Sequence, residues 1–168
     1  MRLLGIAGWS GSGKTTLLTA LIPLLAARGH SVSTVKHAHH DFDLDQPGKD
    51  SWRHRTAGAR EVMIATSRRW ALLHENPGEE PDLAALLARL APVDLVLVEG
   101  FRASPHPKIE VHRPSLGKPP IWPERADIRA VASDVALQHC AVPQLDLSNP
   151  GAVADWIEAF FWPARPAA

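Results

Sequence analysis

The sequence predicts an α/β fold in which helices pack on a mostly parallel sheet and one antiparallel hairpin is added. Three observations lead to this prediction. Continuous apolar runs, such as residues 2–8 and 93–101, are typical of strands buried on both faces. Helical patterns alternate with these runs along the chain, which favours a parallel sheet. Two further apolar runs lie too close together for a crossover helix, so they indicate a hairpin.

The first half of the chain follows a strand, helix, strand order. Gly29 is placed to end the first helix as its C-cap, and Asp50 or Ser51 can cap the short helix after the polar loop 36–51. The predicted elements are a strand at 2–8, a helix from about Lys14 to Arg28, a β-branched strand at 31–37, a short helix at 50–59, and hairpin strands at 61–67 and 68–75.

The second half begins after the turn cluster "NPGEEP". Its strands are apolar enough to be buried, and its last helix has an amphipathic pattern. A Pro-rich region at 103–125 is the least regular part of the chain. The predicted elements are a helix at 82–91, a strand at 93–101, a strand in "KIEVHR", a strand at 128–134, a short strand in "PQLDLS", and a helix at 151–161, with residues 163–168 as a frayed tail.

The composition indicates a globular protein with a single domain covering residues 1–168. Hydrophobic residues make up 45% and charged residues 21%, and 18 basic residues balance 18 acidic ones. No basic block points to a nucleic-acid partner, and no apolar run is long enough to span a membrane. The single cysteine, Cys140, excludes an internal disulfide and fits a reducing compartment. With no signal peptide at the start, the expected location is the cytoplasm.

A phosphate-binding motif follows the first strand. Residues 8–15 read GWSGSGKT and fit the pattern G-x-x-x-x-G-K-[ST] at every fixed position. The glycines let backbone N–H groups surround a phosphate, and the helix that follows directs its positive end at the same anion. Lys14 is expected to reach the β- and γ-phosphates, and the Thr15 hydroxyl is expected to bind Mg²⁺. The predicted phosphate-binding residues are Gly8, Trp9, Ser10, Gly11, Ser12, Gly13, Lys14, Thr15 and Thr16.

This motif between a buried strand and a helix makes the expected fold the three-layer P-loop NTPase fold. Such a site also needs an acid near the magnesium ion. Ligands gather at the carboxyl ends of parallel strands, and Glu99 lies at that end of the strand 93–101. Asp94 lies at the opposite end, about 16 Å away at roughly 3.3 Å per residue. We therefore expect Glu99, with Thr15, to hold the metal, and Asp94 to be a strand-start residue.

The strand 128–134 ends with Ser133 and Asp134. An aspartate after a late strand can accept hydrogen bonds from N1 and the 2-amino group of guanine, and adenine offers no such pair. The Asn-Lys-x-Asp pattern typical of guanine sites is absent. Ser133 and Asp134 are therefore candidate guanine-binding residues, and the spacing favours guanine over adenine.

The polar loop 36–51 allows three interpretations. An extended chain would place His37, His39, Asp41, Asp43 and Asp45 on one side, as a metal site requires. The loop can also be an ordinary solvated loop. Because it leaves the carboxyl end of a strand near the P-loop, we favour a ligand or switch loop over the terminal phosphate. Its candidate residues are Lys36, His37, His39, His40, Asp41, Asp45 and Lys49, of which Asp45 and Lys49 join Lys14 as candidate catalytic residues.

Several segments together resemble the molybdopterin-guanine dinucleotide biosynthesis protein B (MobB) family. They are GWSGSGKTTL, KHAHHDFDLDQPGKDSWRHRTAGA, RRWALLHE, DLVLVEGF and AVASDV, in the order and spacing of that family. The resemblance covers residues 2–161. It implies a homodimer that binds GTP, hydrolyses it weakly, and assists the nucleotidyltransferase that joins GMP to molybdopterin.

Transferred to this chain, the resemblance places phosphate at residues 8–16, Mg²⁺ at Glu99 and guanine at Asp134. It leaves Lys108 as a candidate anion contact in the irregular region, and molybdopterin as a candidate ligand. Two alternatives stay open. A P-loop kinase would need an acceptor and an arginine-bearing lid, for which Arg53, Arg55 and Arg60 are available. A nucleotide-gated adapter without significant turnover would use GTP only to order the loop.

Overall fold

The computed structural model describes residues 1–38, 44–78 and 80–163. Contacts between residues divide the chain into two compact units, and the single domain over residues 1–168 stays a prediction. Unit 1 consists of Met1–His37 and Leu90–Ala168, and unit 2 of Ala38–Arg89. Unit 2 is thus an insertion between two parts of unit 1.

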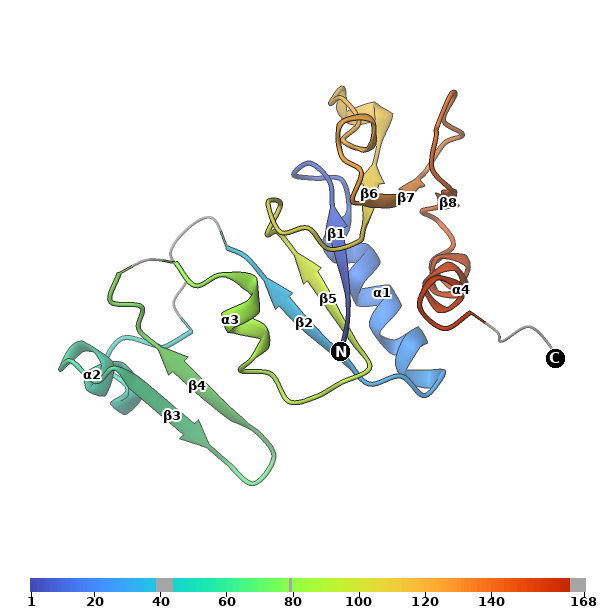
Figure 1. Cartoon of the computed structure of the whole chain (residues 1–168). Coiled ribbons are helices and arrows are strands. Elements are labelled where there is room, and N and C mark those ends of the chain that lie inside the picture. Colours follow the sequence, from blue (N-terminus) through green and yellow to red (C-terminus); the bar gives the residue numbers. More distant parts are fainter. Residues whose placement is uncertain (39–43, 79, 164–168) are drawn as a thin grey trace. The chain divides into compact units, whose positions relative to one another are not determined.

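Unit 1 is built on a six-stranded sheet in the order β2-β5-β1-β6-β7-β8 (Figure 1). Every neighbouring pair in this sheet is parallel. The strands are β1 (Arg2–Ala7), β2 (Val32–Lys36), β5 (Leu95–Glu99), β6 (Lys108–His112), β7 (Ile128–Ser133) and β8 (Gln144–Asp146). The carboxyl ends of β1, β2, β5, β6 and β7 therefore lie along one side of the sheet, and the glycine loop, Glu99 and Asp134 follow or end three of these strands.

One face of this sheet packs against two helices, α1 (Lys14–Ala27) and α4 (Pro150–Phe161). The strands alternate in the direction of their side chains, so every second residue faces these helices. In β6, Ile109 and Val111 belong to the core on the helix side. The core shared by the sheet and the two helices consists of Leu4, Ile6, Leu17, Leu18, Leu21, Leu25, Leu95, Leu97, Ile109, Val111, Ala130, Ala132, Val153, Ala154 and Ile157.

The intervening residues of β6 are polar although they are buried. Lys108, Glu110 and His112 are 3%, 0% and 6% exposed, and they point away from the core of α1 and α4. The backbone N–H groups of Ile121 and Trp122 donate to the Glu110 carboxylate at 2.8–3.0 Å, so the segment that leads into η2 (Trp122–Glu124) lies over this face. The other short helix of the irregular region is η1 (Pro114–Leu116). The Pro-rich region therefore covers the face of β6 that carries its polar side chains.

Unit 2 contains an antiparallel hairpin of β3 (Glu61–Ala65) and β4 (Trp70–His74), with α2 (Asp50–Thr56) before it and α3 (Leu83–Leu87) after it. Met63 pairs with Leu72, and Ala65 pairs with Trp70. Met63, Trp70 and Leu72 therefore share one face of the hairpin, where they are 63%, 67% and 37% exposed. We refer to these three residues as the apolar hairpin face.

The predicted fold class is confirmed: helices pack on a parallel sheet, and the antiparallel pair is separate. The main difference concerns α3, which ends at Leu87 where the sequence predicted a helix to residue 91. Asp82 caps its start by accepting a hydrogen bond from the backbone N–H of Ala85 at 2.7 Å. None of the helices in the described part of the chain has the length and apolar character to cross a membrane.

Candidate functional site

The loop at residues 8–13 connects β1 to α1, and its backbone requires glycine. Gly8, Gly11 and Gly13 have φ values of 139°, 79° and 100°, which residues with a side chain rarely adopt. At Gly8 a Cβ atom would also lie 2.5 Å from the carbonyl oxygen of Val111 and 2.7 Å from Oγ of Ser12. The loop is therefore pressed against the end of β6. Ser12 is buried, and its hydroxyl has no hydrogen-bond partner among the described residues.

Lys14 extends back over this loop. Its ammonium group donates to the carbonyl oxygens of Gly8 and Trp9, both at 3.0 Å. Partial burial lowers the pKa of Lys14, and the nearby Glu99 carboxylate partly opposes this effect. The charges of Arg102 and Lys36 lower the pKa further, so these two cations lie near the same point. Three cations, Lys14, Lys36 and Arg102, thus lie near one another and near the Glu99 carboxylate.

The first turn of α1 leaves its N–H groups available. Its N-cap residue, Gly13, offers no side chain to them, and no acidic residue occupies the first turn. Thr15 and Thr16 lie there with exposed side chains. An uncapped helix N-terminus attracts anions through its free N–H groups and its dipole. Together with the glycine loop and Lys14, this turn fits a phosphate group.

Glu99 ends β5 and lies beside the ends of two neighbouring strands. Its side chain is 15% exposed, and its Oε2 is 4.0 Å from Nζ of Lys36 at the end of β2. Gly100 then allows a close approach, because a Cβ atom there would lie 2.5 Å from Cβ of His37. The ring of His37 also packs against that of Phe101 at 5.0 Å. The structure thus brings Glu99, Lys36 and His37 together at the carboxyl edge of the sheet.

Asp134 follows β7 and is tied to the glycine loop by a residue that the sequence analysis did not select. Nη1 of Arg113 donates to Oδ2 of Asp134 at 2.6 Å, and Nε of Arg113 donates to the carbonyl oxygen of Ser12 at 3.0 Å. Ser133 is buried beside Asp134, and its Oγ accepts from the N–H of Val135 at 3.4 Å. Arg113 comes directly after β6. Its position at the carboxyl end of a predicted strand could have identified it as a candidate site residue.

Two residues predicted to be catalytic, Asp45 and Lys49, belong to unit 2. The Asp45 carboxylate is buried and accepts a hydrogen bond from Nε of Arg55 at 3.1 Å. Arg55 also lies 3.6 Å from Glu75, so the three side chains hold unit 2 together. Lys49 is exposed and stands as the N-cap residue of α2. The structure gives Asp45 a stabilising role in unit 2, and the catalytic roles of Asp45 and Lys49 stay predictions.

Other residues of the predicted ligand loop, His39, His40 and Asp41, lie outside the described residues, as does Asp43 of the metal interpretation. Within residues 1–38, 44–78 and 80–163, no three His, Cys, Asp or Glu side chains are grouped as a metal ion would require. The ligand or switch loop, the solvated loop and the metal site therefore all stay predictions.

Lys108, the candidate anion contact, is committed to partners inside the protein. Its ammonium donates to the carbonyl oxygens of Ser104 and His106 at 2.6 and 3.0 Å, and to Oδ2 of Asp127 at 2.5 Å. These three acceptors use the three donors of an ammonium group. In this arrangement Lys108 positions the loop 104–107, and its contact with an external anion stays a prediction.

Asp94 lies just before the start of β5, at the opposite end of that strand from Glu99, as predicted. Its carboxylate accepts from the backbone N–H and the hydroxyl of Ser31 at 2.8 and 2.6 Å. These hydrogen bonds lower the pKa of Asp94. The residue thus joins the start of β5 to the start of β2.

The comparison with known families gives a direct result. The family model described as "Molybdopterin guanine dinucleotide synthesis protein B" (MobB) matches residues 3–134 of the chain. The chain belongs to the MobB family. The matched range includes the glycine loop, Glu99, Arg113 and Asp134.

Curated MobB relatives match most of the chain. The molybdopterin-guanine dinucleotide biosynthesis adapter protein of Escherichia coli is 45% identical over 159 residues, which are 92% of this chain and 90% of the relative. The protein of the same name from Haemophilus influenzae is 46% identical over 158 residues, or 93% and 87% of the two chains.

Solved MobB structures share the fold. The crystal structure of a MobB protein homologue from Bacillus stearothermophilus is 27% identical with a TM-score of 0.70, covering 96% of this chain and 98% of that one. A crystal structure of molybdopterin-guanine biosynthesis protein B is 29% identical with a TM-score of 0.74, covering 94% and 99%.

Proposed function

We propose that this MobB protein is a GTP-binding adapter in the cytoplasm that assists a nucleotidyltransferase in making the guanine dinucleotide form of molybdopterin. The relatives named as adapters for this biosynthesis support the role. The observation that carries the nucleotide assignment is the convergence of four features at one sheet edge. They are the glycine loop, Lys14, the uncapped start of α1, and the Arg113–Asp134 pair.

Each part of GTP has a group suited to it. The loop N–H groups, Lys14 and Thr16 would hold the phosphates, and Thr15 and Glu99 would hold Mg²⁺. When bound, the metal ion supplies positive charge to the phosphate oxygens. Asp134 would accept the two N–H donors of guanine. Its Oδ2 is held by Arg113, and its Oδ1 has no hydrogen-bond partner in the described part of the chain.

Slow hydrolysis is the expected turnover. A fast GTPase positions the attacking water with a dedicated side chain and neutralises the transition state with an arginine. Arg113, which contacts the glycine loop, is already bonded to Ser12 and Asp134, so this arginine is not free for that role. The proposed role of GTP binding is therefore to prepare the protein for its partner, with hydrolysis secondary.

The apolar hairpin face suggests how the protein associates with itself. Three large apolar side chains, Met63, Trp70 and Leu72, are exposed together on β3 and β4. Surfaces of this kind are typical of protein–protein contacts, in which tryptophan contributes strongly. We propose that this face buries itself against a second copy of the chain in a homodimer.

The test measures binding of GTP and ATP by calorimetry with Mg²⁺, and phosphate release with and without the nucleotidyltransferase and molybdopterin. GTP should bind more tightly than ATP, and Lys14→Ala should weaken GTP by at least about tenfold, because a charge-assisted contact is lost. Thr19→Ala, an exposed change on the same helix, is the control and should bind normally.

Three outcomes would contradict the proposal. Equal affinity for ATP would remove the guanine assignment. Normal GTP binding by Lys14→Ala would remove the phosphate site. Transfer of the γ-phosphate to a small acceptor would identify a kinase.

A further inference from the structure

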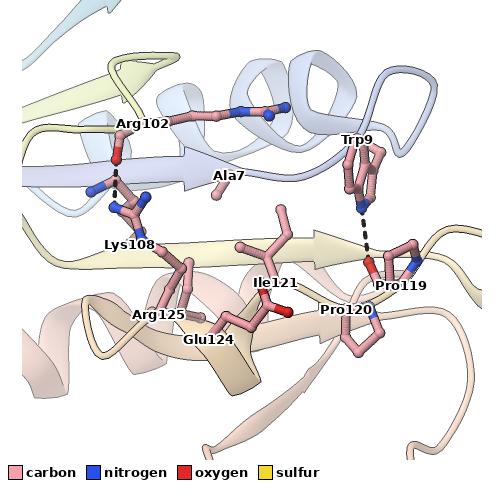
Figure 2. A pocket seen from close by; sticks show the side chains of 10 residues that line it. Ala7, Trp9, Arg102, Lys108, Pro119, Pro120, Ile121, Glu124 and Arg125 are labelled. Atoms are coloured by element: carbon pink, nitrogen blue, oxygen red, sulfur yellow. Dashed lines mark hydrogen bonds between the residues drawn. The ribbon is translucent and has the colours of Figure 1, made fainter.

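A cavity of about 240 Å³ lies next to the glycine loop, on the sheet face opposite to α1 and α4 (Figure 2). Its lining comes from separate parts of unit 1 that meet over β1 and β6. The residues that line it are Ala7, Trp9, Arg102, Lys108, Pro119, Pro120, Ile121, Glu124, Arg125 and Ile128. The proposed nucleotide site shares Trp9 with this set, and Arg102 lies near enough to Lys14 to lower its pKa, so the cavity adjoins that site.

The walls of the cavity are flat and mostly apolar. The indole of Trp9 forms part of the lining, and Figure 2 shows it next to Pro119, with Pro120 and Ile121 following. Nε1 of Trp9 donates to the carbonyl oxygen of Pro119 at 2.8 Å, which fixes the plane of the indole. An aromatic wall of fixed orientation suits a planar ring.

Two carboxylates, of Glu110 and Asp127, anchor the segments around this cavity. The fully buried carboxylate of Glu110 anchors Ile121 and Trp122 through their N–H groups. Asp127 accepts from both Lys108 and Arg125, and these bonds lower the pKa of Asp127. Arg125 also donates to the carbonyl oxygen of Arg102. Lys108 and Arg125 are thus structural, and they share the one negative charge of Asp127.

Two charged side chains at the cavity remain uncommitted. The guanidinium of Arg102 lies 5.5 Å from the centre of the Trp9 ring, and it makes no hydrogen bond or ion pair with the described residues. The carboxylate of Glu124 likewise has no such partner there, and Figure 2 draws it close to Ile121. Lys118 adds a second positive charge, 5.8 Å from the Trp9 ring. The cavity therefore combines a flat apolar slot, one free acceptor and a cationic side.

We propose that this cavity binds a phosphorylated pterin. The bicyclic ring fits between Trp9 and Ile121, and the 2-amino group and ring N–H of a pterin can donate to Glu124. Arg102 and Lys118 would bind the phosphate. The assignment of a pterin rests on the proposed function. Guanine carries the same pair of donors, so the shared chemistry is a 2-amino-4-oxo ring with a phosphate.

Trp9 connects this cavity to the phosphate site. Its indole is a wall of the cavity, and its carbonyl oxygen accepts from Nζ of Lys14 at 3.0 Å. We expect a phosphate bound by Lys14 to compete with the loop carbonyls, including that of Trp9, for its ammonium donors. Nucleotide binding therefore changes the support of a residue that contacts the pterin, and the two ligands should alter each other's affinity by equal factors.

The test uses neopterin monophosphate as the probe, with binding followed by calorimetry and by quenching of tryptophan fluorescence. Glu124→Gln should weaken the probe at least about tenfold, because the amide presents a donor where an acceptor is needed. Arg102→Ala should weaken it to a similar extent. Asp155→Asn on α4 and Arg129→Ala on β7 remove the same charges away from the cavity and should leave probe binding unchanged.

GTP binding is measured in parallel, because it distinguishes failure of this proposal from failure of the proposed function. Glu124→Gln should bind GTP as the unaltered protein does. If GTP binds but neopterin monophosphate does not, or if both cavity variants bind the probe normally, the pterin site is excluded. GMP is the competing ligand. If Glu124→Gln weakens GMP binding as much as it weakens binding of neopterin monophosphate, the cavity takes guanine and the pterin assignment is wrong.

Discussion

Arg113 and Asp134 form a 2.6 Å ion pair at the carboxyl ends of two adjacent strands, β6 and β7. Since Arg113 also donates to the carbonyl of Ser12, the proposed guanine reader is connected to the phosphate loop through one guanidinium. The aspartate therefore does not sit at the end of a loose loop. Its carboxylate is oriented before any base arrives, which reduces the entropy lost on binding.

Replacing Asp134 tests the base assignment. In Asp134→Asn, the amide has an N–H₂ group that opposes the 2-amino group of guanine but suits the 2-oxo group of xanthine. We expect GTP affinity to fall at least about tenfold, and the ratio of XTP to GTP affinity to rise. Calorimetry with both nucleotides measures this ratio. An unchanged ratio would show that Asp134 does not contact the base.

Gly8 tests the shape of the phosphate loop. In Gly8→Ala, the added Cβ would lie 2.5 Å from a backbone oxygen of Val111, so the loop must move away from β6. We expect GTP binding to be lost. Gly29→Ala is the matched control, since Gly29 also has a positive φ, 88°, but a Cβ there meets nothing within 4 Å. It should retain binding, with a small loss of stability measured by urea unfolding.

His106 predicts a pH dependence of stability. Its ring is 6% exposed with no hydrogen-bond partner for either nitrogen among the described residues, and burial lowers its pKa from 6.5 to about 4. Between these values the unfolded state binds a proton that the folded state does not. The free energy of unfolding should therefore fall as the pH drops from 6.5 to about 4, by up to about 3 kcal/mol.

The variant His106→Phe removes this titration and should flatten that part of the stability profile. Urea unfolding at a series of pH values compares it with the unaltered protein. His54→Ala, a change at an exposed position of α2, is the control for losing a histidine elsewhere. A profile of His106→Phe that runs parallel to the original would contradict the assignment.

Trp70 tests the proposed dimer. Trp70→Glu places a charge in the apolar hairpin face, where a second copy of the chain would have to desolvate it. We expect self-association to weaken about 30-fold or more, in keeping with a loss of roughly 2 kcal/mol at an interface hot spot. Sedimentation equilibrium measures it. Arg68→Glu, in the exposed hairpin turn, should associate normally, and equal effects of both changes would exclude this face.

The sheet and the hairpin could be predicted because their signals are local. The gap at residues 67–68 is too short for a crossover, so it required an antiparallel pair, and the structure has one. The strand β6 was placed correctly, but its position between β1 and β7 was not foreseen. Strand order depends on contacts between distant segments, which a pattern of neighbouring residues does not contain.

The phosphate loop could be predicted because its motif has a fixed spacing, and Glu99 and Asp134 could be selected because each lies at the end of a predicted strand. The loop from Gly8 to Thr15 has such a spacing, whereas Arg113 gains its place from the pairing of β6 with β7. For Asp45, the pattern of the polar loop does not reveal the pairing with Arg55 that the structure has, and its catalytic role stays a prediction. For Lys108, too, only the folded chain shows that its partners are internal.

The insertion of unit 2 has a consequence for the architecture of the sheet. The strands β2 and β5 are hydrogen-bonded neighbours that run parallel. The chain between them must therefore return from the carboxyl end of β2 to the amino end of β5. Elsewhere a dozen or so residues, usually as one helix, suffice for such a return. Most of Ala38–Arg89 is therefore surplus to closing the sheet. The pairing of β2 with β5 does not require the hairpin or its exposed tryptophan.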